Sequence, residues 1–206
     1  MAGMVRLGGI AAFVAVLMVV VTIALAQSIA TNKVLGVILT LVLTGCILLA
    51  FWTTKTLFNA YSYRRADVAI LGIIALFVLS WLLSLVGGGG MAAAGSAGGN
   101  VMGIIGLIVL LAAFVLSILF AIQSMGFAPS GGGIWKAIGI LYLITSILLI
   151  LAIVFLILAG VAVSASMAAV GGFLFLIGGL VWIASLIVHG IGLVSGAGKM
   201  QTAAPA

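Results

Sequence analysis

The chain has 206 residues, of which 67% are hydrophobic and only 4% are charged. A soluble domain carries about a quarter charged residues, so this composition excludes a soluble globular fold and indicates an integral membrane protein. The net charge of +6 comes from Lys and Arg residues scattered between apolar runs, a distribution that sets membrane orientation and argues against nucleic-acid binding.

Six apolar runs are each long enough to cross a bilayer as a helix, which takes on the order of 20 residues. In chain order these predicted spans are Leu7–Ala26, Val34–Thr53, Val68–Val86, Val101–Ile122, Ile134–Leu158 and Met167–Val188. Lipid offers no partner to a backbone amide or carbonyl, so each run must satisfy its own backbone as an α-helix. The sequence therefore predicts an all-α integral membrane protein, a bundle of about six transmembrane helices forming a single membrane domain over residues 1–206.

The first span resembles a signal peptide, because Arg6 precedes an apolar run that ends in the small-residue pattern Ala24-Leu25-Ala26. The run Leu7–Ala26 is longer than a usual signal core and is long enough to span the membrane. We therefore expect a retained helix.

The second and third spans carry hydroxyl residues at helical spacing, Thr40 with Thr44 and Ser80 with Ser84. These hydroxyls could line a narrow polar path. They could equally bond their own helix or a neighbouring one, a contact that contributes about 0.6 kcal/mol on average, and packing is the favoured interpretation. Cys46 has no second cysteine to pair with and is interpreted as a small packing residue.

Between these two spans lies the only sizeable polar segment, Thr54–Asp67. Its cations and aromatic residues suit contact with anionic lipid at the headgroup layer, and they could equally dock a membrane or cytoplasmic partner. The residues predicted to make this contact are Lys55, Phe58, Tyr61, Tyr63, Arg64 and Arg65.

The loop charges predict the orientation of the bundle. Placing the segment Thr54–Asp67 in the cytoplasm also places Arg6, Lys136 and Lys199 there, and leaves only Lys33 outside. This split follows the positive-inside rule and predicts that both termini are cytoplasmic. The expected location is the cytoplasmic membrane of a prokaryote.

A glycine-rich segment, residues 87–100, is expected to be a flexible extracytoplasmic link between two three-span halves, 1–86 and 101–195. Short matches recur in the same order in both halves: Gln27-Ser28 with Gln123-Ser124, Gly36 with Gly139, and Trp81 with Trp182. Three spans per half would invert one half relative to the other, as in several transporter folds. The alternative is chance, since such matches are common among so few residue types.

The sixth span has the most regular pattern, with small residues every seven positions at Ser164, Gly171, Gly178 and Ser185. A seven-residue period keeps one stripe facing a partner, and small side chains let two helix backbones approach closely. The sequence therefore predicts a helix-packing seam here, whose partner is another helix of this chain or another subunit.

Asp67 and His189 are the candidates for acid–base or ligand chemistry. Asp67 stands at the start of the third span, where a helix cap is favoured over an ion site. His189 has no second histidine to act with, and an interfacial, hydrogen-bonded histidine is favoured over a haem ligand or proton shuttle. No catalytic residue, metal site or cofactor is predicted, and no glycine motif has the form of a phosphate loop.

Two classes of function remain open. The first is a non-catalytic structural or accessory subunit of a larger membrane complex, with the lipid bilayer and other membrane subunits, or further copies of itself, as partners. The second is a small transporter or channel for a neutral or apolar solute, built on the inverted repeat. An enzyme is disfavoured because the acid–base or ligand sets that hydrolytic and redox sites need are missing.

Overall fold

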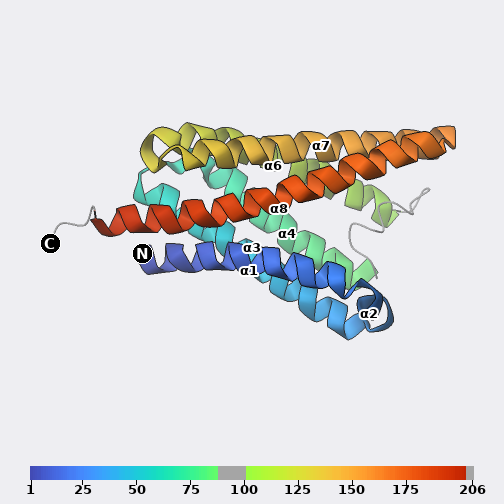
Figure 1. Ribbon diagram of the computed structural model, residues 1–206, viewed down its shortest axis with the longest axis horizontal. Helices are drawn as coiled ribbons and strands as arrows, with labels where there is room; N and C mark the ends of the chain where they lie inside the picture. The colour runs from blue at the N-terminus through green and yellow to red at the C-terminus, as the bar shows by residue number, and fades with distance from the viewer. Residues whose placement is uncertain (88–100, 203–206) are drawn as a thin grey trace.

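The computed structural model describes residues 1–87 and 101–202 (Figure 1). The described residues form seven α-helices and one 3-10 turn, with no strand among them. Six of the helices are long and apolar enough to cross a membrane, so the predicted all-α membrane bundle is confirmed. The predicted glycine-rich link lies outside the described residues except for Gly87, which ends its helix.

The helix bounds are as follows. They are α1 (Ala2–Ala24), the short α2 (Ala26–Thr31), α3 (Lys33–Ala60), the 3-10 turn η1 (Arg64–Ala66), α4 (Asp67–Gly87), α6 (Val101–Gly131), α7 (Ile134–Ala162) and α8 (Ala165–Thr202).

Several helices are longer than the predicted spans. The helix α3 continues to Ala60, and α6 continues to Gly131 through Pro129. Helical hydrogen bonding still satisfies the backbone where the apolar run ends, so loss of hydrophobicity alone does not stop a helix. The stop after α6 is made by Gly132, whose φ of +101° favours glycine. Between α7 and α8, Val163 adopts a left-handed φ of 49°.

The six long helices alternate in direction, so both termini lie at one end of the bundle, on the left in Figure 1. This end, the terminal end, also holds the turn η1 and the turn between α6 and α7. The predicted division of cations matches this arrangement, because Lys33 begins α3 at the opposite, far end. Which end faces the cytoplasm remains a prediction from the positive-inside rule.

The helices form a closed ring in chain order. Each of α1, α3, α4, α6, α7 and α8 packs on the next, and α8 returns to pack on α1. The helices α3 and α8 also touch across the ring. In Figure 1 the helices α1, α8 and α7 lie in front, with α3, α4 and α6 behind them.

The order around this ring bears on the predicted repeat of 1–86 and 101–195. A two-fold axis in the membrane plane reverses the direction of every helix and also the sense in which a half winds around the ring. Here α6, α7 and α8 run opposite to α1, α3 and α4, yet both halves wind in the same sense because the chain makes one continuous circuit. No rotation relates two halves of that kind, so the helix order does not fit an inverted repeat.

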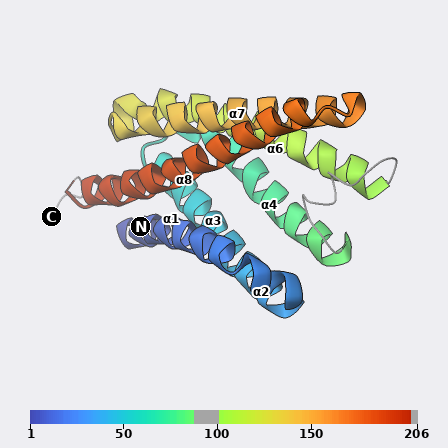
Figure 2. The same cartoon turned by 45° about the vertical axis from the view of Figure 1, so that its right-hand side comes forward.

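Burial of large side chains is greatest at the terminal end. The largest buried side chains lie there, among them Trp135, Phe58, Phe120 and Phe127. Toward the far end the pair α1–α3 diverges from the pair α7–α8, as Figure 2 shows. Large apolar side chains at that end of α8 are exposed, including Phe173 at 64%.

Candidate functional site

The most distinctive polar group of the bundle is His189 on α8, which is fully buried. Its Nε2 lies 2.6 Å from the Thr54 hydroxyl of α3, and its Nδ1 lies 3.0 Å from the Tyr142 hydroxyl of α7. Three helices therefore meet at one imidazole. The predicted hydrogen bonding of His189 is confirmed, because α3 and α7 supply a partner for each ring nitrogen, whereas its position at the membrane–water interface stays a prediction.

The hydrogen bonds of the Thr54 hydroxyl indicate which nitrogen of His189 carries the proton. The Thr54 hydroxyl donates to the carbonyl of Ala50 at 2.8 Å, so its oxygen accepts from the Nε2–H of His189. The unprotonated Nδ1 then accepts from the Tyr142 hydroxyl, which gives a neutral imidazole with both nitrogens satisfied. No lone pair is left to ligate haem iron or another metal in this arrangement.

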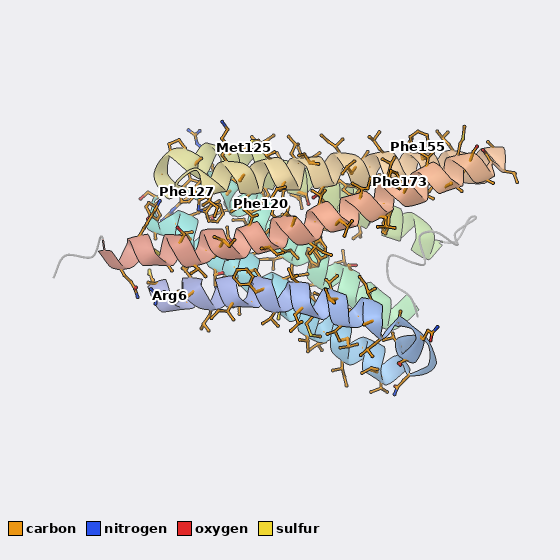
Figure 3. The ribbon with its side chains drawn as sticks, in the orientation of Figure 1. Arg6, Phe120, Met125, Phe127, Phe155 and Phe173 are labelled. Atoms are coloured by element: carbon orange, nitrogen blue, oxygen red, sulfur yellow. The ribbon has the colours of Figure 1, made fainter. Side chains whose placement is uncertain are left out.

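Aromatic rings enclose the imidazole and separate it from lipid and water. The ring centroids of Phe51, Phe120, Trp135 and Tyr142 lie 5.5, 5.7, 5.9 and 5.8 Å from that of His189. In Figure 3 Phe120 and Phe127 lie between the helices at the terminal end, whereas Phe155 and Phe173 lie at the far end on α7 and α8. The imidazole is thus fully buried among aromatic rings, so the site has the character of a packing centre.

The buried hydroxyls around this centre mostly bond their own helices. Thr53 donates to the carbonyls of Leu49 and Ala50, and Ser146 donates to that of Tyr142. Ser124 and Thr145 are buried with a hydroxyl that has no hydrogen-bond partner among the described residues. These hydroxyls do not form a continuous polar path across the described part of the bundle.

The predicted seam on α8 is placed mainly against α7. A Cβ added to Gly171 would lie 2.9 Å from the Leu156 side chain, and one added to Gly178 would lie 2.9 Å from that of Leu149. Ser185 is fully buried, and its hydroxyl donates to the backbone carbonyl of Trp182 at 2.6 Å.

Ser164 does not share the helical part of this stripe. It lies in the turn before α8, where its hydroxyl accepts from the Met167 amide at 3.4 Å and lies 3.0 Å from the Ser166 hydroxyl. It stays a prediction that the stability of the bundle depends on the small size of Gly171, Gly178 and Ser185.

The residues predicted to contact lipid or a partner are divided between surface and interior. Arg64 and Arg65 are exposed in η1, and Lys55 is half-buried over the Trp52 ring at 5.3 Å from its centroid. Their contact with lipid or a partner stays a prediction. Phe58, in contrast, is fully buried.

The surface placement predicted for Phe58 is wrong because α3 turns this residue toward α6 and α7. Its ring centroid lies 4.1 Å from that of Phe127 and 4.8 Å from that of Trp135. Tyr61 is half-buried against the same Phe127 ring, at 5.6 Å.

Tyr63 connects the turn after α3 to α6 by hydrogen bonds. Its hydroxyl lies 3.0 Å from both the backbone oxygen and the side-chain oxygen of Gln123, and donates to them. Burial raises the pKa of the Tyr63 phenol, and the neighbouring Arg65 cation opposes this by a smaller amount. The phenol thus serves as a hydrogen-bond donor at neutral pH.

Asp67 is the first residue of α4, at the positive end of the helix dipole. Its Oδ1 is buried and has no hydrogen-bond partner among the described residues. Among the described residues, the favourable interaction of the Asp67 carboxylate is the one with the dipole of α4.

Sequence reasoning missed Trp135 and Tyr142, which lie seven residues apart on α7 and enclose His189. Their seven-residue spacing is typical of one helix face, but apolar residues surround them in the sequence, so the spacing does not distinguish them.

Comparison with known protein families, with curated proteins and with solved structures finds no match to this chain.

Proposed function

We propose that this chain is a non-catalytic subunit of a larger membrane complex, located in the cytoplasmic membrane of a prokaryote with both termini in the cytoplasm. The observation that carries the proposal is the contrast between the two ends of α8. At the terminal end α8 packs on both α1 and α7, whereas at the far end it packs on α7 and leaves Phe173, Leu176 and Leu180 exposed.

Two glycines on the exposed side of α8 support the proposal that another subunit contacts this helix. A Cβ added to Gly172 or Gly179 would meet nothing within 4 Å. Glycine facing lipid gains no contact and costs helix stability, roughly 1 kcal/mol relative to alanine in soluble helices. Close approach of a helix from another subunit, or from a second copy of the chain, would use the space that these glycines leave.

The buried histidine centre also favours a structural role. Both nitrogens of His189 are occupied by Thr54 and Tyr142. A catalytic or transport site needs polar groups that are free to meet a substrate. The centre instead joins three helices by hydrogen bonds whose partners all belong to the chain.

The alternative is a transporter or channel for a neutral or apolar solute. It is favoured by the buried hydroxyls of Ser124 and Thr145, which lack partners among the described residues. It is also favoured by a local likeness of two hairpins, because Gly36 faces the Ile29 side chain and Gly139 faces that of Met125. The winding of the helix ring opposes the inverted repeat on which this alternative depends.

Purification from native membranes in a mild detergent tests the proposal. We expect stoichiometric co-purification of one membrane protein, or a defined homo-oligomer, with the wild-type chain. The double variant Gly172→Leu/Gly179→Leu should lose that association and keep its own thermal stability, since leucine at both positions enters open space.

A matched control is a leucine at Val181, which is not part of either glycine stripe. An unassociated wild-type monomer that carries solute into proteoliposomes would favour the transporter. Association that survives both glycine changes would remove the far end of α8 as the contact.

A further inference from the structure

The outward face of α3 carries a pocket at the terminal end. It has a volume of about 290 Å³ and is lined by Met1, Trp52, Lys55, Thr56, Asn59 and Ala60. We propose that this pocket binds the headgroup of an anionic glycerophospholipid, taken laterally from the bilayer.

The pocket is built on one stripe of α3. Trp52, Lys55, Thr56 and Asn59 are spaced by three and four residues, so their side chains share one face of the helix. Phe51, Leu57 and Phe58, on the opposite side, are buried in the bundle. The stripe is therefore the part of α3 that turns away from the other helices.

Charge gives this pocket its preference for an anion. The Lys55 ammonium lies 5.3 Å from the Trp52 ring centroid, a cation–π contact that holds it beside the pocket. Among the described residues no carboxylate forms a salt bridge with Lys55, and the only Asp of the chain, Asp67, begins another helix. A phosphodiester can supply the missing negative charge.

Asn59 places a second polar side chain in the pocket lining, beside Lys55. Its Oδ1 is buried and has no hydrogen-bond partner among the described residues. A headgroup that carries hydroxyls beside its phosphate, as phosphatidylglycerol does, offers a donor for an acceptor of this kind. Trp52, exposed at 45%, has the amphipathic ring that is typical of the headgroup layer.

The same stripe becomes apolar toward the membrane centre, which identifies the ligand as a lipid. Leu49, Leu41 and Ile38 continue the face and are exposed. Gly45 lies among them, and a Cβ added there would meet nothing within 4 Å. A cationic pocket above an apolar track matches a phosphate headgroup above acyl chains, whereas a soluble anion would use only the pocket.

Native mass spectrometry of the delipidated full chain in detergent tests the site. Equal amounts of phosphatidylglycerol and phosphatidylcholine with the same acyl chains are added. We expect phosphatidylglycerol to bind preferentially, and Lys55→Gln to reduce this preference about fivefold, which is the effect of one cation near an anionic lipid surface. Lys136→Gln removes an exposed cation of the same end outside the pocket and should leave the preference unchanged.

Two further measurements separate a lipid from a soluble anion. Gly45→Leu, placed in open space, should weaken long-chain phosphatidylglycerol and spare the dihexanoyl form. Glycerol 3-phosphate at millimolar concentration should not displace the long-chain lipid; displacement would make the pocket a site for soluble anions and overturn the proposal. Equal losses in Lys55→Gln and Lys136→Gln, or no lipid preference in the wild type, would also overturn it.

Discussion

Gly9 of α1 and Gly190 of α8 face each other where these two helices cross. A Cβ added to Gly9 would lie 2.9 Å from the carbonyl oxygen of Gly190, and one added to Gly190 would lie 3.0 Å from the carbonyl oxygen of Gly9. On the adjoining face of α1, Gly8 lies directly against the Thr53 side chain of α3. The first helix thus meets the backbone of α8 and the Thr53 side chain of α3 through two consecutive glycines.

Replacing Gly9 by leucine should therefore destabilise the bundle. The added atoms meet backbone that cannot move without parting α1 from α8, and overpacking of this kind typically costs about 1–3 kcal/mol. The measurement is the thermal unfolding temperature of the detergent-purified protein. Gly3→Leu is the control on the same helix, because a side chain at Gly3 enters open space; equal effects of the two variants would contradict the close crossing.

Adjacent glycines of α8 offer a sharper comparison. Gly178 faces the Leu149 side chain of α7, whereas nothing lies within 4 Å of a Cβ added to Gly179. Gly178→Leu should lower the unfolding temperature of the isolated chain, and Gly179→Leu should leave it nearly unchanged. If leucine is tolerated equally well at both positions, the predicted seam through Gly171, Gly178 and Ser185 has no energetic role within the chain.

The histidine centre predicts strong coupling between two residues. Tyr142→Phe leaves the Nδ1 of His189 buried without a donor, which should cost about 1–3 kcal/mol. His189→Leu should cost a similar amount, because the Thr54 and Tyr142 hydroxyls lose their partner. A double-mutant cycle on the free energy of unfolding should show that the double variant is less destabilised than the sum of the two; strict additivity would mean that the hydrogen bond makes no net contribution.

The orientation of the bundle can be tested by labelling single cysteines in a Cys46→Ala background. Ala60→Cys and Gly133→Cys place thiols at exposed positions of the terminal end, and Ala26→Cys places one at the far end. An impermeant maleimide added to intact cells should label position 26 and spare positions 60 and 133. The reverse pattern would mean that the positive-inside rule fails for this chain.

The sequence sufficed to predict six spans because span length depends on bilayer thickness alone. It could not predict which face of a span points inward. Every face of these helices is apolar, and in lipid an apolar side chain is equally suited to the interior and to the surface. Phe58 was placed at the surface for another reason, because it follows the predicted span and belongs to the polar segment Thr54–Asp67, although it is fully buried.

Polar residues near the ends of spans were misread for a related reason. Thr54 directly follows the predicted span Val34–Thr53, so it was assigned to a surface segment. The helix α3 continues past it, and the side chain turns inward to His189. A hydroxyl that can donate to its own helix costs little to bury, so polarity alone did not mark the boundary between bundle and loop.

The crossing of α1 with α8 also has a consequence for biogenesis. Gly9 and Gly190 belong to the first and last helices, so the ring cannot close until nearly all of the chain has been synthesised. At roughly 5–20 residues per second, α1 waits in the membrane for on the order of ten seconds or more with part of its packing face uncovered. During that interval Gly9 is open to the wrong helix, and a slow ribosome would lengthen the period in which mispairing or degradation can compete with closure.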